Sequence, residues 1–261
     1  MKFFVLSLLL SVASNLVAAD ADKPMTQAQG DEMVKELRVI RQLLEAMRSR
    51  QLVETPETSA VPPPTAPTAP TAPDGKPALA KVTIDLARTI GDPKAPVTLV
   101  EFTDYQCGFC SMFHRDTFAK IKKEFVDTGM VRFASMDLPL DFHSDAFQAA
   151  KASHCAGEQN RYWEYRDLLS SRPQPFSMEV LLKLAEQVNL DKPAMRTCIA
   201  SSKYDAKIKG DMREAEQANL SATPSFIVGK STATGVEGEA VIGAYPFDYF
   251  KEALTRIKSL L

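Results

Sequence analysis

Cys107 and Cys110, separated by two residues, are the side chains in this sequence best suited to chemistry. They come after residues 97–103, six of which are apolar, β-branched or both, as in a buried strand. The residues that follow carry apolar side chains at helical spacing: Phe113, Phe118, Ile121 and Phe125. The two cysteines are therefore expected at a strand-to-helix junction, with Cys107 at the helix N-terminus.

A cysteine in that position is suited to thiol–disulfide exchange. The unpaired backbone N–H groups and the positive end of the helix dipole stabilise a thiolate, which lowers its pKa. The thiolate is the species that attacks a disulfide. Cys110, one turn further in, is placed to form a disulfide with Cys107 and to release a bound partner. We expect an exposed sulfur at Cys107 and a shielded one at Cys110.

Two other uses of a Cys-x-x-Cys pair are less favoured. The pair is also half of a common zinc site, but the remaining candidate ligands supply neither a second such pair nor two histidines at ligand spacing: His114, His143, His154, Cys155 and Cys198. A structural disulfide gains little, because closing a two-residue loop removes little chain entropy. Redox chemistry is predicted, with no metal and no cofactor.

The N-terminus predicts export. Residues 1–19 combine Lys2, an apolar segment at 3–16 and a small-residue cleavage site at 17–19, as in a secretory signal peptide. A retained membrane anchor is the alternative. Export would place the mature chain in the periplasm or another oxidising, extracytoplasmic compartment. The net charge of −2 gives no indication of nucleic-acid binding.

Residues 20–54 are predicted to contain an amphipathic helix, and residues 55–80 a linker. Within 26–54, apolar residues alternate at spacings of four and three, like a coiled-coil seam: Met33, Leu37, Ile40, Leu44 and Met47. The linker repeats Thr-Ala-Pro and favours extended polyproline II. Because a stiff spacer hinders folding back, self-association through 26–54 is favoured over docking on the chain's own domain.

Residues 81–261 are predicted to form an α/β domain. A strand at 82–84 and a turn at 91–96 precede the strand that leads to Cys107, and the next strand, 130–136, completes a βαβ unit. Residues 144–220 are predicted to be helical. Two strands at 226–228 and 240–242 and a helix at 247–261 end the chain.

This order resembles the DsbA-like thiol–disulfide oxidoreductases of the thioredoxin superfamily over about residues 81–261. Three motifs carry the resemblance: Glu101-Phe102-x4-Cys107-Gly108-Phe109-Cys110, Cys155-Ala156-Gly157-Glu158-x4-Trp163, and Ala222-Thr223-Pro224-Ser225-Phe226-Ile227-Val228-Gly229. The resemblance implies a thioredoxin-like fold with an inserted helical domain at about 144–220, preceded by the N-terminal helix and the Pro-rich linker.

The resemblance also implies roles for single residues. Cys107 matches the nucleophile, Cys110 the resolving cysteine and Pro224 the cis-proline that faces them. The backbone of Thr223 would then face the sulfurs and pair with a bound peptide as an added strand. Glu101 matches a buried acid, and a partly buried carboxylate beneath Cys110 could accept or deliver its proton. An ordinary edge charge is the alternative for Glu101.

The remaining cysteines form a second pair. Cys155 and Cys198 both lie in the predicted helical block, which suggests a structural disulfide between two helices. A redox relay to Cys107 is the alternative. His114, one turn after Cys110, is predicted to be a solvated histidine on a helix face, with tuning of the thiolate as the alternative.

Two departures from the DsbA pattern bear on the direction of the reaction. Gly108-Phe109 replaces Pro-His, and a threonine precedes Pro224. Both look similar to DsbC-type isomerases, which also carry an N-terminal oligomerisation segment. The sequence therefore predicts an exported disulfide isomerase or reductase. The alternatives are a DsbA-like dithiol oxidase and a non-catalytic chaperone or a maturation factor for one client.

The partners that follow from this prediction are of three kinds. They are cysteine-containing exported client proteins, a membrane redox partner that reduces or reoxidises the cysteine pair, and further copies of the same chain bound through 26–54.

Overall fold

The computed structural model describes residues 26–53, 79–171 and 175–261. The predicted signal peptide and residues 55–78 of the predicted linker lie outside this range. The chain divides into two compact units, Met1–Pro64 and Thr65–Leu261. Among the described residues, no helix is both long enough and apolar enough to cross a membrane.

The first unit contributes one long helix, α2 (Gln27–Val53), which agrees with the helix predicted at 26–54. Its described seam residues Met33, Leu37 and Ile40 are all exposed. The side chains of Leu44 and Met47 lie outside the described set. The helix therefore presents an uncovered apolar stripe along the part that can be described.

The second unit is built on a six-stranded sheet with the order β1-β6-β5-β3-β4-β2. Its strands are β1 (Leu79–Thr83), β2 (Thr89–Ile90), β3 (Val97–Thr103), β4 (Val131–Asp137), β5 (Ser225–Ser231) and β6 (Gly235–Ile242). The pair β3–β4 is parallel, and the other neighbouring pairs are antiparallel. The folded unit begins before Lys81, because Leu79 and Ala80 already pair with β6.

A helical run connects β3 to β4. It consists of α3 (Gly108–Phe113), a π-helical turn η2 (His114–Phe118), α4 (Ala119–Ile121) and a second π-helical turn η3 (Lys122–Val126). Phe113 and Phe118 are five residues apart, which is the span of the i→i+5 hydrogen bond of a π-helix. Both are buried, so the wider turns keep successive aromatic side chains on the core side.

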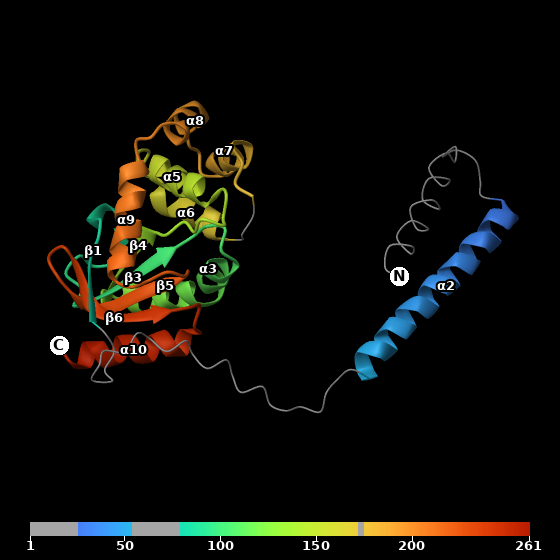
Figure 1. The fold of residues 1–261 in the computed structure, drawn as a ribbon, viewed down its shortest axis with the longest axis horizontal. Coiled ribbons are helices and arrows are strands. Elements are labelled where there is room, and N and C mark those ends of the chain that lie inside the picture. The colour runs from blue at the N-terminus through green and yellow to red at the C-terminus, as the bar shows by residue number, and fades with distance from the viewer. Residues whose placement is uncertain (1–25, 54–78, 172–174) are drawn as a thin grey trace. The chain divides into compact units, whose positions relative to one another are not determined.

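Alternate residues of β3 contribute to two different hydrophobic cores, because successive side chains point to opposite faces of a strand. Leu99 packs on the face covered by Phe113 and by Phe250 of α10 (Phe247–Ser259). Val100 and Phe102 pack on the other face, where α9 (Asp205–Gln217) lies against the sheet. Figure 1 shows α10 below the sheet and α9 on its other side. Every residue of β3 is buried as a result.

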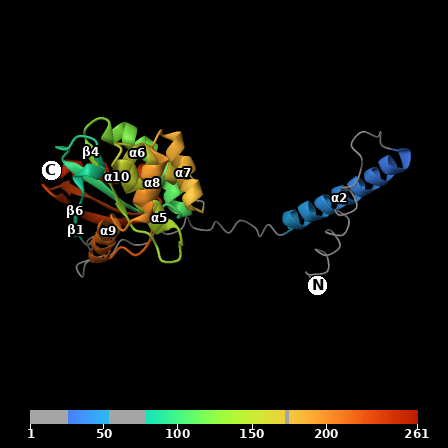
Figure 2. The same ribbon diagram turned by 90° about the horizontal axis from the view of Figure 1, so that it is seen from above.

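The helical block forms a third core. It contains α5 (Ala146–Gly157), α6 (Tyr162–Ser170), α7 (Met178–Gln187) and α8 (Lys192–Ala200). Figures 1 and 2 show these four helices gathered together at one end of the domain. A disulfide between Cys155 of α5 and Cys198 of α8 joins two of them, with Cα atoms 5.9 Å apart.

Candidate active site

Cys107 follows β3 and occupies the N-cap position of α3. The Cys107 backbone N–H donates to the Asp104 carbonyl (3.1 Å), and the Cys107 carbonyl accepts from the Ser111 N–H (3.1 Å) as the helix begins. The buried Asp104 carboxylate holds the turn by accepting from the Gln106 N–H (2.8 Å). The predicted position of Cys107 at a helix N-terminus is therefore confirmed.

Both sulfurs of this pair are free thiols. Cys107 is 6% exposed and Cys110 is 3% exposed, so the prediction of an exposed first sulfur is wrong in degree. The reason is the segment before β5, since Cys107 Sγ lies 3.3 Å from the Thr223 carbonyl oxygen, to which it donates. A reacting partner must therefore approach the Cys107 sulfur alongside this backbone segment, because the sulfur does not lie on an open surface.

The environments of the two thiols push their pKa values apart. A hydrogen bond from Cys110, together with Thr223 and the N–H groups of Cys110 and Phe109, lowers the pKa of Cys107 to about 5 against an opposing effect of burial. Burial, followed by the neighbouring Cys107 and the charge of Glu101, raises the pKa of Cys110 well above its ordinary value. At neutral pH the pair therefore holds one thiolate and one thiol, as sequential exchange requires.

The peptide bond between Thr223 and Pro224 is cis. This geometry brings the carbonyl of Thr223 to Cys107, immediately before β5 starts at Ser225. The Thr223 hydroxyl is buried, and it helps to lower the pKa of Cys107. The structure thus brings together Cys107, Cys110, Thr223 and Pro224, as the resemblance implied.

Glu101 lies in the middle of the sheet, where β3 is flanked by β4 and β5. It is fully buried, as its match to a buried acid implied, so the alternative of an edge charge is wrong. Its carboxylate forms an ion pair with Arg166 of α6. Burial raises the pKa of Glu101, while the positive charge of Arg166, and that of His114 when it is protonated, oppose the increase.

The thioredoxin family profile matches residues 85–242, which include the cysteine pair, the helical block and the cis-proline. The chain belongs to the thioredoxin family. Membership of this family agrees with the fold predicted from the sequence, which is a thioredoxin-like sheet with a helical insertion.

Solved structures of thioredoxin-like proteins resemble this chain along most of their length. With Wolbachia pipientis α-DsbA1 the TM-score is 0.60 at 27% identity, covering 66% of this chain and 91% of the other. With Chlamydia trachomatis DsbA the TM-score is 0.58 at 26% identity, covering 68% and 94%.

Curated relatives match a similar segment. Disulfide bond formation protein D of Bacillus subtilis is 29% identical over 148 residues, 53% of this chain and 66% of that protein. The Na(+)/H(+) antiporter NhaA 3 of Salinispora tropica is 34% identical over 139 residues, but these are only 21% of the antiporter. The chain thus spans about a fifth of the first curated relatives it matches.

Arg166 is the site residue of this thioredoxin-family chain that the sequence reasoning missed. It is fully buried, and its guanidinium carbon lies 5.4–5.6 Å from the centres of three aromatic rings: Phe118, Phe133 and Trp163. Its position gave a signal, because it follows Tyr162 by four residues and precedes Leu169 by three on the buried face of α6. A charge on a core stripe requires a buried partner, which here is Glu101.

His114 also differs from its prediction as a solvated histidine. Its side chain is 13% exposed, and its Nε2 lies 2.7 Å from Nη1 of Arg166. The π-helical turn that starts at His114 directs the ring toward α6 and Phe118. The histidine therefore belongs to the surroundings of Glu101.

The other histidines have partners of their own and do not complete a zinc site with the Cys107–Cys110 pair. His143 Nδ1 lies 2.8 Å from Asp104 Oδ2, and His154 Nε2 lies 2.8 Å from Asp137 Oδ2. Within the described ranges, the residues with ligand spacing are Cys155, Glu158 and Cys198, and both of these sulfurs are in the disulfide.

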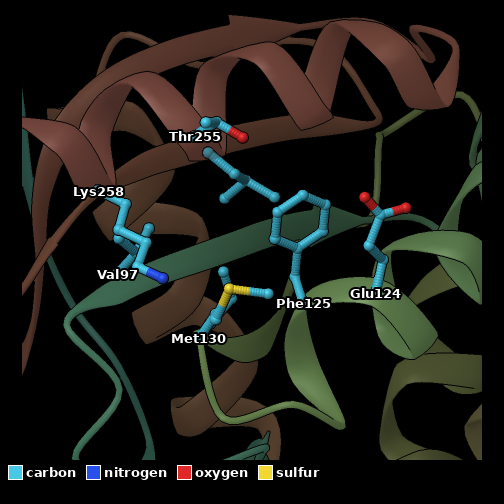
Figure 3. Close-up of a pocket in the computed structure, with 8 residues that line it drawn as sticks. Val97, Glu124, Phe125, Met130, Thr255 and Lys258 are labelled. Carbon is cyan, nitrogen blue, oxygen red and sulfur yellow. The ribbon is translucent and has the colours of Figure 1, made fainter.

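A pocket of about 240 Å³ lies away from this site (Figure 3). Helix α10 contributes Leu254, Thr255 and Lys258, and the opposite wall includes Phe125 and Met130. The pocket also contacts Val97, the first residue of β3, whereas the cysteines follow the last residue of that strand. Neither this pocket nor the second one, between β1 and α9, is lined by Cys107 or Cys110.

Proposed function

We propose that this chain is a thiol–disulfide oxidoreductase that acts on protein disulfides through Cys107 and Cys110. The observation that carries the proposal is the opposite shift of the two pKa values at a helix N-terminus beside a cis-proline. The names of its relatives support it, since they include a disulfide bond formation protein and DsbA. An inert Cys-x-x-Cys in a chaperone would need no such difference between its thiols.

The reaction has two steps. The Cys107 thiolate attacks a client disulfide, so that a bond forms between Cys107 and one client sulfur while the other leaves as a thiolate. Cys110 then loses its proton to Glu101 and attacks Cys107, which breaks the mixed disulfide and releases the second client thiolate. The client gains two electrons, and the Cys107–Cys110 pair becomes a disulfide. In isomerisation, a client thiol attacks the mixed disulfide in place of Cys110.

The segment before β5 binds the client. An extended peptide that pairs with the backbone of Thr223 places its disulfide beside Cys107, whose sulfur already contacts that carbonyl. Pro224 keeps this backbone turned toward the sulfur through its cis bond. The site therefore recognises a sulfur in an extended segment of the client and depends little on the client's sequence.

Isomerisation or reduction is the favoured direction, in an exported protein whose copies associate through α2. The exposed stripe of Met33, Leu37 and Ile40 supports association, since apolar side chains on one helix face gain stability by pairing. Several linked sites would hold a misfolded client while one thiolate attacks. A membrane redox partner restores the cysteine pair. DsbA-like oxidation is the second candidate, supported by the names of the solved structures.

Scrambled-disulfide refolding beside dithiol oxidation tests the proposal on the full chain. Ile40→Asp places a charge on the seam of α2, and Val39→Asp is its matched control at the same 51% exposure. An oligomeric isomerase reshuffles wrong disulfides, loses this activity with Ile40→Asp and keeps it with Val39→Asp. Oxidation without reshuffling in all three proteins would identify a DsbA-like oxidase. Absence of both reactions would overturn the proposed function.

A further inference from the structure

The surroundings of Arg166 contain an arrangement that the proposed exchange chemistry does not use. The guanidinium donates from Nε to Ser135 Oγ (2.9 Å) and from Nη2 to the Glu101 carboxylate. Its Nη1 lies 2.7 Å from His114 Nε2. With rings on several sides, this side chain has little freedom to move. It therefore connects the histidine to the carboxylate through a fixed geometry.

The contact between Arg166 and His114 fixes the form of the imidazole. A guanidinium has five N–H donors and no acceptor. His114 Nε2 must consequently accept, so the ring is neutral and carries its proton on Nδ1. Protonation of Nε2 would remove that acceptor and place two positive groups against each other.

A second partner for the same nitrogen lies at the surface. Asp167 Oδ1 is 3.3 Å from His114 Nε2, and the Asp167 side chain is 57% exposed. A carboxylate can only accept, so it bonds Nε2 only when that nitrogen carries a proton. The bonds to Arg166 and to Asp167 therefore exclude each other: the first belongs to neutral His114 and the second to protonated His114.

We propose that His114 is a positioning residue whose Nε2 alternates between Arg166 and Asp167 and thereby controls the protonation of Glu101 while Cys110 attacks. This inference rests on the proposed exchange reaction, in which the Cys110 thiol transfers its proton to the Glu101 carboxylate. Histidine is the side chain that most readily changes charge near neutral pH.

The direction of the effect follows from the charges that face His114. Glu101 lies on β3, Arg166 and Asp167 lie on α6, and the adjacent Arg115 and Asp116 pair with each other at the surface. The buried Tyr105 and Tyr162 face Arg166, and burial raises the pKa of both hydroxyls, so they stay neutral. A positive His114 lowers the pKa of Glu101. In mild acid, protonated His114 thus keeps Glu101 ionised and able to receive the proton.

The test titrates Glu101 by its carboxyl ¹³C shift in the reduced full chain. His114→Gln keeps an oxygen that accepts from Arg166 but cannot become charged. Asp167→Asn removes the charge of the surface partner, whose carboxylate also lies 3.9 Å from Arg166. We expect His114→Gln to raise the midpoint of the Glu101 titration by about 0.5–1 pH unit. Asp167→Asn should shift it in the same direction by less. Unchanged midpoints in both variants would overturn the inference, and if His114→Gln does not fold, the surface variant decides alone.

A second readout uses a glutathione mixed disulfide formed on Cys107. Its Cys110-dependent release should slow about threefold to tenfold more below pH 6 in His114→Gln than in the native chain, in proportion to the lost ionisation of Glu101. An equal decline in the two proteins would contradict the inference. No release from the native chain at any pH would instead overturn the proposed function, while the ¹³C titration would still decide the role of His114.

Discussion

The two cysteine pairs of this chain have identical side chains, but one pair is free and the other is bonded. Cys107 and Cys110 are three residues apart on one helical turn and remain free thiols. Cys155 and Cys198 are 43 residues apart on two helices and are bonded. A bond across a long loop removes much entropy from the unfolded chain, whereas a bond across two residues removes little. The first pair is therefore available for exchange and the second for stability.

The surroundings of the pairs differ in the same way. Cys107 has the N–H groups of Cys110 and Phe109 beside it, which favour a thiolate. In the thiol form its sulfur donates to the Thr223 carbonyl. Cys155 lies in the core of the helical block, and its sulfur is bonded to Cys198. What a cysteine does here is decided by the backbone and the charges around its sulfur.

The largest expected effect separates the pairs by activity. Cys107→Ser removes the attacking thiolate and should reduce the rate of disulfide exchange by about 10³-fold or more. The double variant Cys155→Ala and Cys198→Ala should stay within about twofold of the native rate. Reduction of a fluorescent disulfide-linked peptide measures both. A large loss in the double variant would show that the second pair relays electrons to the first.

The reverse comparison concerns stability. Removing the Cys155–Cys198 disulfide should lower the free energy of unfolding by about 3–4 kcal/mol, because its loop is long. At pH 5, where the lowered pKa of Cys107 no longer stabilises the fold, replacing Cys107 and Cys110 by serine should change that free energy by less than about 1 kcal/mol. Guanidinium unfolding followed by circular dichroism measures both variants. Equal losses would mean that the two pairs are not divided between stability and reactivity.

The pH dependence of alkylation sharpens the contrast within the reactive pair. With the pKa of Cys107 lowered to about 5, its reaction with iodoacetamide should stay constant from pH 8 to pH 6 and fall by half near pH 5. Cys110 should remain unreactive, because its pKa is raised well above its ordinary value. A midpoint near pH 8.5, the value of an ordinary cysteine, would contradict the assigned environment.

The same shift has a consequence for stability. A thiol whose pKa is lower in the folded chain than in the unfolded chain stabilises the fold above its unfolded pKa. That contribution is lost as the pH falls toward about 5. The reduced native chain should therefore lose stability relative to Cys107→Ser between pH 9 and pH 5. A difference that stays constant across this range would count against a stabilised thiolate.

The smallest expected effect concerns the segment before β5. Thr223→Val removes the hydroxyl that helps to lower the pKa of Cys107, and should raise the alkylation midpoint by about 0.5–1 pH unit. Thr117→Val is the control, because that hydroxyl bonds to the Tyr245 carbonyl (3.2 Å). An equal shift in the two variants would point to general loosening of the fold.

Local patterns were sufficient to predict most of the fold and the placement of the reactive pair. The buried strand before Cys107, the helix after it and the terminal hairpin all follow from runs of apolar residues. Ser177 precedes α7 and caps it by accepting from the Val180 N–H, a position that serine favours. Such features depend on neighbours within a few residues, which a sequence displays directly.

The parts that local patterns missed depend on contacts between distant segments. Glu101 and Arg166 are 65 positions apart, and neither predicts the other by spacing. The short strand β2 forms only because Thr89 and Ile90 meet β4. From the sequence His114 is predicted to be a surface residue, because local spacing does not show that α6 packs beside it. The charged groups around a reactive sulfur are brought together by the tertiary fold, so local sequence patterns could not predict their pairing.

Trapping of the mixed disulfide tests the central claim most directly. Cys110→Ser keeps the nucleophile and removes the thiol that resolves its adduct. After incubation with a scrambled, disulfide-containing protein, acid quenching and peptide mass mapping should locate a client disulfide on Cys107, and Cys107→Ser treated alike should yield none. An adduct on Cys155 or Cys198, or no adduct in Cys110→Ser, would contradict the assignment of Cys107 as the nucleophile.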